Sequence, residues 1–579
     1  MIYSTRFGQY HETLTLRRAR SLRCGCTSPN EATRVSKSQP LLRALMHRAQ
    51  QADVPFHVPG HKHGAGVTEL FGSTVGTNPL RYDLTEISGL DNLSSPSGAI
   101  AEAQQLAAAA FGADRTWFLV NGCSSGIHAA IMACTGPGDT MIVSRNCHLS
   151  VFSGMVLSGC TPWWVEPEVD SEFGIAHGMD PHALIEALEE AKTCRRRVSA
   201  VMVVSPTYFG VAAPIKELAH VCHEYRVPLL VDEAHGSHFG THPQLPPSAL
   251  QQGADCVMHS THKVLSAMTQ AAMLHVKGDL VNTSRISKAL QTLQSSSPSY
   301  LLLASLDAAT AKLTDPGYMM LPLQAVQHAL GLLKDVPGIN ILNSHFIDAY
   351  IRGDTDSSYN NELMYNATNT DEVPVVDPVR SPRGNHTQDP LRITVSVTQL
   401  GLTGYEAAAY LEEEHGVVAE LSTSKVVVFA FGVGSTVAQG TTLGQAFLAL
   451  SSTQLRPSTP PLDRDGTVKS QPDDLACSSS EQPSSTSCHP AQIKYSSHCN
   501  AMTPREAFFS KGERVTSCQA VGRISAELLC PYPPGVPVVF PGEVITSQAL
   551  QVLRDTLTLG GTVTGAADPT LQLLTVVTS

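Results

Sequence analysis

Two charged side chains follow apolar segments of this chain, at places where each could do chemistry. Lys263 comes shortly after the apolar run 256–258 and precedes a second apolar segment, 267–276. Asp232 ends the apolar run that begins at Val227. Burial disfavours the ammonium form of a lysine and leaves a nucleophilic amine. Such an amine is what a Schiff base with a carbonyl compound requires.

An acid and then a lysine, each at the end of a buried strand, form the arrangement that a pyridoxal phosphate enzyme needs. A carboxylate at Asp232 would keep a pyridine nitrogen protonated, and the pyridinium stabilises a carbanion. Each residue also has an ordinary explanation when it is taken alone. Asp232 would then cap the following loop, and Lys263 would be a solvated lysine.

Three further features fit the same chemistry. The turn 121–126 joins a predicted strand to a predicted helix, so Ser124, Ser125 and the helix dipole could hold a phosphate. Ser260 offers another hydroxyl, with the polar His262 beside it. His148 is an aromatic candidate for stacking on a ring. A plain Gly/Ser turn and an ordinary packed histidine are the alternatives, but the order phosphate turn, histidine, aspartate, lysine favours one site.

The elements that must position these residues alternate between strands and helices from about residue 114 to 276. Apolar runs at 116–120, 140–143, 200–204 and 227–232 predict strands, each followed by a polar cluster. This pattern indicates an α/β protein with a mostly parallel sheet covered on both faces. Ligands bind such sheets at the carboxyl ends of the strands, where the polar clusters fall.

The chain resembles the Orn/Lys/Arg decarboxylase family, which has the aspartate-aminotransferase-like fold. The resemblance covers about residues 39–550 and rests on several sequence motifs that occur in the same order as in the family. These are PFHVPGHK at 55–62, DLTE at 83–86, NGCSS at 121–125, RNCH at 145–148, DEAH at 232–235, STHK at 260–263, SPSY at 297–300, TPREA at 503–507, PYPPGVP at 531–537 and PGE at 541–543.

The resemblance implies a role for each matching residue. Lys263 would be the Schiff-base lysine, Asp232 the partner of the pyridine nitrogen, and His148 the residue stacked on the ring, with Ala234 against its other face. The phosphate region would be held by Ser124, Ser125, Ser260 and His262. Lys263 or His262 would return a proton to the substrate carbon, and no metal is expected. Cys123 departs from the family, whose members often carry Thr or Ser there.

The implied function is pyridoxal phosphate-dependent decarboxylation of a basic amino acid, arginine first and then lysine or ornithine, giving an amine for polyamine biosynthesis. Arginine comes first because the layout lacks a long N-terminal wing domain. Glu420 and Glu543 are candidates for reading the substrate, and each could equally be structural. A different fold type I reaction, such as transamination or aldol cleavage, and a catalytically silent regulatory homologue remain alternatives.

The resemblance also implies an architecture and an assembly. A fold type I large domain with a seven-stranded sheet would span residues 39–335, and a small α/β C-terminal domain residues 336–579. The polar composition of two stretches, near 354–388 and 451–501, predicts disordered inserts. Relatives form dimers or higher homo-oligomers with shared active sites. Residues 57–62 and 297–300 are therefore candidates to serve a neighbouring subunit.

Composition limits the remaining possibilities. The formal net charge of −12 argues against nucleic-acid binding, and no apolar stretch is long enough to span a membrane. Residues 1–38 are rich in Arg and Ser and poor in acids, which predicts an organellar transit peptide, plastid or other, or a disordered tail on an otherwise cytoplasmic protein. The fourteen cysteines show no zinc-ligand spacing and are interpreted as reduced thiols.

Overall fold

The computed structural model describes residues 39–52, 54–313, 315, 317–343, 386–454, 501–532 and 536–578. The predicted leader, 1–38, lies outside the described residues, as do most of the two predicted inserts. The edges of those inserts belong to the fold. Strand β12 (Thr387–Gln388) pairs with β7 (Val211–Ala212), and helix α17 continues to Gln454.

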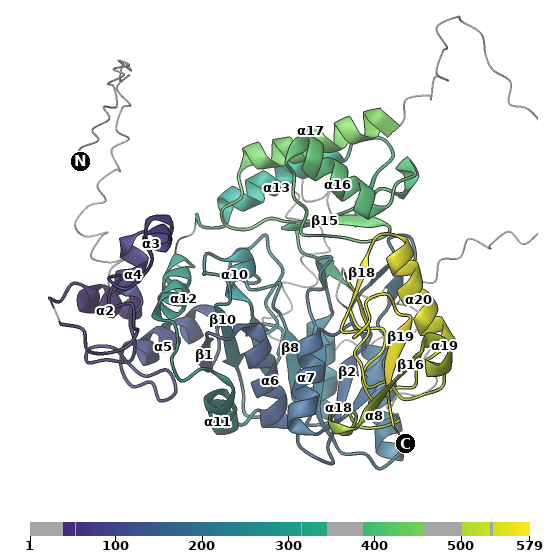
Figure 1. The fold of residues 1–579 in the computed structure, drawn as a ribbon, viewed down its shortest axis with the longest axis horizontal. Helices are drawn as coiled ribbons and strands as arrows, with labels where there is room; N and C mark the ends of the chain where they lie inside the picture. Colours follow the sequence, from purple (N-terminus) through teal and green to yellow (C-terminus); the bar gives the residue numbers. More distant parts are fainter. Residues whose placement is uncertain are drawn as a thin grey trace, which may run out of the picture.

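A seven-stranded sheet forms the centre of the large domain (Figure 1). Only β10 runs against its neighbours, so the prediction of a mostly parallel sheet is confirmed. In spatial order the strands are β1 (Arg115–Leu119), β10 (Ala272–Val276), β9 (Cys256–His259), β8 (Leu229–Asp232), β6 (Val198–Val204), β2 (Thr140–Ser144) and β3 (Thr161–Val165).

The two faces of this sheet belong to two hydrophobic cores, because successive side chains of a strand point to opposite faces. On β8, for example, Val231 enters one core and Leu230 the other. The Leu230 face is covered by α6 (Gly122–Cys134), α7 (Leu149–Ser158) and α11 (Thr283–Leu293). The opposite face is covered by α2 (Pro40–Ala49), α5 (Ala99–Phe111), α8 (Pro181–Thr193), α9 (Ile215–Glu224) and α12 (Tyr300–Lys312).

Helix α6 packs closely against the sheet at Gly126. A Cβ at Gly126 would lie 2.7 Å from Leu119 and 3.3 Å from Met258, so glycine is needed at this contact. The close approach fixes the N-terminus of α6 against β1 and β9.

An antiparallel four-stranded sheet follows, covered by three helices (Figure 1). Thr403 caps α16 in a capping box with Glu406, as its spacing to Glu406 allows. Val395, Val427 and Phe447 join the core on the Val231 face of the large sheet. The elements are β11 (Asn340–Ile341), β13 (Arg392–Ser396), β15 (Val426–Ala430), β14 (Leu421–Ser422), α13 (Met320–Leu333), α16 (Gly404–His415) and α17 (Val437–Gln454).

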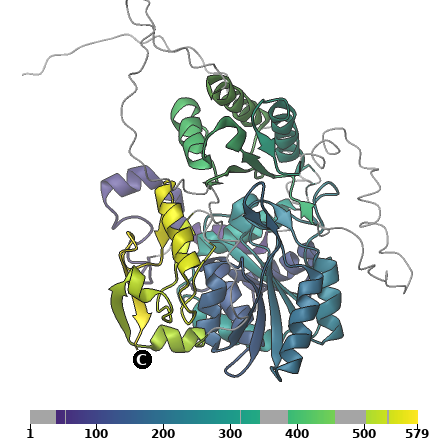
Figure 2. The ribbon, with the colours of Figure 1, turned by 90° about the vertical axis from the view of Figure 1, so that its right-hand side faces the viewer.

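The C-terminal segment 501–578 has a hydrophobic core of its own and lies beside the large sheet (Figure 2). Thr503 caps its first helix in a capping box with Glu506. The predicted domain limits themselves stay predictions. The elements are α18 (Pro504–Phe509), β16 (Gly512–Thr516), α19 (Ser517–Ala520), β17 (Cys530–Tyr532), α20 (Ser547–Thr558), β18 (Thr562–Thr564) and β19 (Leu573–Val577).

Short elements complete the described chain. They are α3 (Glu69–Val75), α4 (Thr77–Tyr82), α10 (Thr261–Val264), the hairpin β4 (Val169–Asp170) and β5 (Ile175–Ala176), and a 3-10 turn at Thr398–Leu400. Every helix among the described residues is too short or too polar to cross a membrane.

Candidate active site

Asp232 and Lys263 meet at the carboxyl ends of two neighbouring parallel strands. Asp232 pairs with Met258 in the β8–β9 ladder, and α10 places Lys263 one turn after the end of β9. Burial raises the pKa of Asp232, while the charges of His148 and Lys263 lower it. Burial lowers the pKa of Lys263, and the Asp232 charge acts in the opposite direction. The structure therefore brings together the two residues on which the sequence analysis depends.

Lys263 is accessible on part of its surface, although protein surrounds its amine. The residue is exposed in the single chain, yet burial is the largest cause of its lowered pKa. Its Nζ lies 2.7 Å from Nε2 of His235 and 6.0 Å from the centre of the Tyr208 ring. The expectation of a fully buried lysine is thus only partly met. A partly open amine is also one that an incoming aldehyde or substrate can reach.

His235 is buried and links Lys263 to the second sheet, a connection that the sequence analysis did not identify. Nη2 of Arg392, on β13, donates to Nδ1 of His235 at 2.9 Å. Arg392 is itself 4% exposed, and burial lowers the pKa of its guanidinium. The edge of the Tyr208 ring packs against His235, with the ring centres 4.8 Å apart.

His148 lies at the start of α7, close enough to Asp232 and Lys263 for their charges to act on it. It caps α7, and its Nδ1 accepts hydrogen bonds from the Ser150 backbone N–H at 3.2 Å and the Ser150 hydroxyl at 2.7 Å. Because Nδ1 accepts, the proton of the neutral ring is on Nε2. Burial lowers the pKa of His148, and Asp232 partly offsets this effect.

The candidate phosphate residues fall on two adjoining segments. Cys123, at the start of α6, lies within hydrogen-bonding reach of Ser260, and its thiol pKa is raised first by burial and then by the Asp232 charge. Ser125 Oγ donates to the Gly122 carbonyl at 2.8 Å, so it is already engaged within its own turn. Ser124 is partly buried on the same turn.

The loop after β9 brings the other candidates to the site. His262 Nδ1 donates to the Ala271 carbonyl at 3.0 Å. The proton of the neutral ring is therefore on Nδ1, and Nε2 is an acceptor. Thr261 is 1% exposed, and its hydroxyl has no hydrogen-bond partner among the described residues. Ala234 is 8% exposed, and its N–H donates to Asp232 Oδ1 at 3.1 Å.

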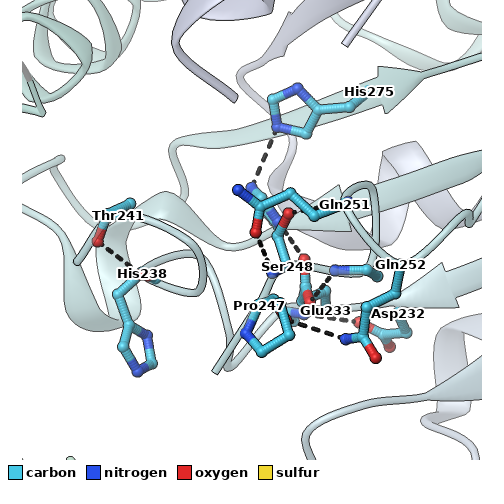
Figure 3. A network of polar contacts seen from close by, with 12 residues as sticks. Asp232, Glu233, His238, Thr241, Pro247, Ser248, Gln251, Gln252 and His275 are labelled. Carbon is cyan, nitrogen blue, oxygen red and sulfur yellow. Dashed lines mark hydrogen bonds and ion pairs between the residues drawn. The ribbon is translucent and has the colours of Figure 1, made fainter. Parts of the chain in front are cut away.

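A chain of buried hydrogen bonds runs behind the site, from the residue after β8 through β9 and β10 to β1. Figure 3 shows part of it, with Glu233 and His275 labelled. Glu233 Oε2 accepts from Nε2 of His259 at 2.7 Å, and Nδ1 of His259 lies 3.1 Å from Nε2 of His275. Nδ1 of His275 lies 2.8 Å from the hydroxyl of Thr116. All four side chains are at most 2% exposed. The chain ties the end of β8, next to Asp232, to the end of β9.

A second buried pair joins the large domain to β13. His238 Nε2 donates to Asp389 at 2.9 Å, and both side chains are at most 1% exposed. Asp389 also accepts from the Leu391 N–H at 2.9 Å. Because Asp389 lies three residues before Arg392 in the chain, this pair helps to place that guanidinium.

The two candidate substrate-reading acids differ in their surroundings. Glu543 forms a buried ion pair with Arg145, whose Nη2 donates to Oε2 at 2.8 Å, and it also accepts from the Phe540 N–H at 2.9 Å. Glu543 thus has a structural role, holding the C-terminal segment to the loop after β2. Glu420 is exposed, and its charge raises the pKa of both Lys263 and Arg392.

Of the two segments expected to serve a neighbouring subunit, one is largely committed to its own chain. Tyr300 is fully buried, and its hydroxyl donates to the Asp91 carbonyl. In the other, His61 donates to Asp83 at 3.1 Å, while the adjacent Phe56 is 93% exposed.

Comparison with known proteins decides the family. The sequence profile of the major domain of the Orn/Lys/Arg decarboxylases matches residues 39–439, and the profile of their C-terminal domain matches residues 491–559. The chain belongs to the Orn/Lys/Arg decarboxylase family. This confirms the predicted family and the predicted enzyme class, an amino-acid decarboxylase.

Individual relatives of this family member extend over nearly the whole chain. It is 35% identical to the arginine decarboxylase of Bacillus anthracis over 540 residues, which are 93% of this chain and 97% of that protein. It is 34% identical to the arginine decarboxylase of Bacillus subtilis, with the same coverage. The solved lysine decarboxylase LdcF of Francisella novicida shares the fold, with a TM-score of 0.71 and 21% identity over 95% of this chain and 84% of that one.

Proposed function

We propose that this decarboxylase uses pyridoxal phosphate and acts on arginine. The observation that carries the proposal is the meeting of Asp232 and Lys263 at the strand ends, in a chain that two arginine decarboxylases match over 93% of its length. Lysine and ornithine are the next candidates, because the family profile covers all three amino acids.

The residues at the strand ends fit pyridoxal phosphate. Lys263 would hold it covalently, Asp232 would face its ring nitrogen, and His148 and Ala234 would cover the two ring faces. The start of α6 has no side-chain cap, and the space where a Cβ of Gly122 would lie is open. The Gly122 N–H donates to the Gln270 carbonyl at 3.1 Å, so the N–H groups that follow it in the first turn are the ones that could serve a phosphate. The unpartnered hydroxyl of Thr261 lies in the same loop as the other candidate phosphate residues, Ser260 and His262, with Ser124 and Ser125 across from them on α6.

When bound, pyridoxal phosphate supplies the electron sink that stabilises a carbanion at the substrate carbon. The chain supplies the remaining functions. Asp232, which is 4% exposed, offers a negative charge that water does not screen. Lys263 and His262 are the two candidates to return a proton to the carbon. Because Nδ1 of His262 already carries the proton that it donates to Ala271, Nε2 can give a proton only when the ring is an imidazolium. The donation from His262 to the Ala271 carbonyl fixes the orientation of that ring.

Glu420 is the candidate to recognise the distal cation of the substrate. It is exposed in the single chain, and its charge acts on Lys263 and Arg392. A carboxylate can accept two parallel hydrogen bonds from a guanidinium, which distinguishes arginine from lysine and ornithine by geometry.

Incubation of the purified protein with arginine, lysine and ornithine tests the proposal. Carbon dioxide and the matching amine, fastest with arginine, are expected. A keto acid product would instead indicate a transaminase. A protein that retains no pyridoxal phosphate and releases no carbon dioxide would be a silent regulatory homologue.

We further propose a homodimer or higher homo-oligomer with shared active sites. Support comes from a run of exposed apolar side chains near the predicted intersubunit segment 57–62. They are Val54, Phe56, Val58, Leu70 and Phe71. Light scattering coupled to size-exclusion chromatography tests this proposal, which a monomer at micromolar concentration would contradict.

The leader and the pathway also remain proposals. The family match begins at residue 39, directly after the predicted transit peptide or tail. We propose delivery to a plastid or other organelle, with a cytoplasmic protein as the alternative, and use of the amine in polyamine biosynthesis. Fusion of residues 1–38 to a fluorescent protein would show whether the segment directs transport.

A further inference from the structure

The His235 ring lies between the amine of Lys263 and the guanidinium of Arg392. Nδ1 is 2.9 Å from Arg392 Nη2, and Nε2 is 2.7 Å from Lys263 Nζ. His235 and Arg392 are 5% and 4% exposed, so water does not compete freely for either ring nitrogen. The three side chains come from the loop after β8, from α10 and from β13.

The hydrogen-bonding capacities of these groups allow one arrangement of protons. A guanidinium carries donors only, so Nδ1 of His235 must accept and is bare. A neutral imidazole keeps one N–H, which must then be on Nε2. That N–H points at Lys263 Nζ and needs a lone pair there. An ammonium has no lone pair, so the free Lys263 in this arrangement is a neutral amine.

The surroundings of Lys263 contain charges that act in both directions. Burial is the largest cause of its lowered pKa, and Arg392 lowers that pKa further, while Asp232, Cys123 and Glu420 raise it. Burial is the largest cause of a lowered pKa of His235, and the Arg392 charge lowers it further, so that ring stays neutral. The titratable and charged groups that face the amine, taken over all neighbouring elements, are Cys123, His148, Tyr208, Asp232, His235, His262, Arg392 and Glu420.

We propose that Arg392 fixes the Nε2–H tautomer of His235, and that His235 thereby holds the free Lys263 as a neutral amine ready to attack an aldehyde. His235 and Arg392 are positioning residues in this scheme. The amine nitrogen forms a double bond to the aldehyde carbon, and the aldehyde oxygen leaves as water with the two amine protons. The inference depends on the proposed function only for the identity of the aldehyde.

The arrangement also gives Arg392 a reason to be buried. Its Nη1 has no hydrogen-bond partner among the described residues, and a buried cation with an unsatisfied donor costs stability. A guanidinium kept there at such a cost is consistent with a role in the site rather than in packing. Neutral lysine is the reactive form, so each pKa unit changes the reactive fraction about tenfold below the pKa.

The first test titrates the amine itself. Full-length protein freed of cofactor is labelled at a series of pH values with an amine-specific acylating reagent, and mass spectrometry compares Lys263 with the exposed Lys216. In the wild type, Lys263 is expected to titrate below the ordinary lysine value of about 10.4. In Arg392→Met it is expected to titrate at least one pH unit higher than in the wild type, which means about tenfold less neutral amine at neutral pH. An unchanged titration in Arg392→Met would overturn the proposal.

The second test separates the tautomer from the charge. Nitrogen-15 NMR of histidine-labelled wild-type protein, with His235→Asn to assign the signal, distinguishes a bare ring nitrogen from one that carries hydrogen. A bare Nδ1 and a protonated Nε2 are expected, and a protonated Nδ1 would refute the scheme even if Arg392→Met does not fold. Glu420→Gln is the matched charge control, because it removes a nearby charge without touching His235; Lys263 is expected to titrate lower in this variant while the tautomer stays the same.

Neither test requires turnover, so the two proposals can fail separately. Protein that releases carbon dioxide from arginine but shows no effect of Arg392 on Lys263 would refute only the positioning scheme. Protein with the expected titration but no decarboxylation of any basic amino acid would refute only the proposed function.

Discussion

The carboxylate of Glu233 lies 2.7 Å from Nε2 of His259, and the two side chains are 2% and 0% exposed. Glu233 directly follows Asp232, and His259 directly precedes Ser260. Their hydrogen bond therefore holds together the two strand ends that carry the candidate cofactor residues. A buried carboxylate is costly unless its partners are complete, and Glu233 completes its set with the Ala249 N–H at 2.9 Å.

Removal of the Glu233 carboxylate is expected to destabilise the protein. Glu233→Ala leaves the His259 and Ala249 donors buried without an acceptor and opens a cavity, for a loss of about 2–5 kcal/mol. Glu233→Gln keeps one acceptor and is expected to cost less. Urea unfolding followed by fluorescence measures the loss, with the exposed Glu224→Ala as control. Equal unfolding midpoints for Glu233→Ala and wild type would show that the hydrogen bonds of Glu233 contribute nothing to stability.

Acid is expected to weaken the fold through His275. Burial lowers the pKa of this ring well below its ordinary value near 6.5, so the unfolded chain binds a proton that the native protein does not. Above about pH 6.5 the ring is neutral in both states, and His275 does not reduce the free energy of unfolding. As the pH falls below this value, the free energy of unfolding drops by up to about 1.4 kcal/mol per pH unit. Unfolding of wild type and His275→Gln between pH 8 and 5 isolates this ring, because the opposing raised pKa of Glu233 is present in both proteins. Parallel pH profiles would rule out the assignment.

Sequence alone could predict Asp232 and Lys263 because each ends or follows an apolar strand, and parallel neighbours bring such ends together. It could not predict that Arg392 reaches His235, since the two are 157 residues apart and meet only when the second sheet packs on the first. Nor could it predict the His259–His275 contact. Histidines within apolar strands give no local signal, and only the antiparallel pairing of β9 with β10 places them side by side.

Glu420 and Glu543 are expected to affect different properties. Glu543→Gln weakens the buried pair with Arg145. The Arg145 guanidinium also lies 4.9 Å from the centre of the Trp164 ring. Without the ion pair the C-terminal segment should become more sensitive to protease, while the preference among substrates should not change.

Glu420→Gln should raise the KM for arginine about tenfold or more, with an unchanged melting temperature. This factor corresponds to the loss of one hydrogen bond to a charged group, which contributes about 1.5–3 kcal/mol. An altered preference in Glu543→Gln, together with an unaltered one in Glu420→Gln, would reverse these assignments.

Lys263→Ala is expected to abolish both the visible absorbance of bound pyridoxal phosphate and the decarboxylase activity. The alanine cannot bond to the aldehyde carbon, and the loss of a proton donor alone costs about 10²–10⁴-fold in rate. Lys216→Ala, on the exposed side of α9, is the matched control and should keep both properties. Absorbance spectra and carbon dioxide release of the two variants, measured on protein of equal melting temperature, give the answer. A Lys263→Ala protein that stays yellow and active would mean that another amine holds the cofactor, and His235 and Arg392 would then have no amine to position.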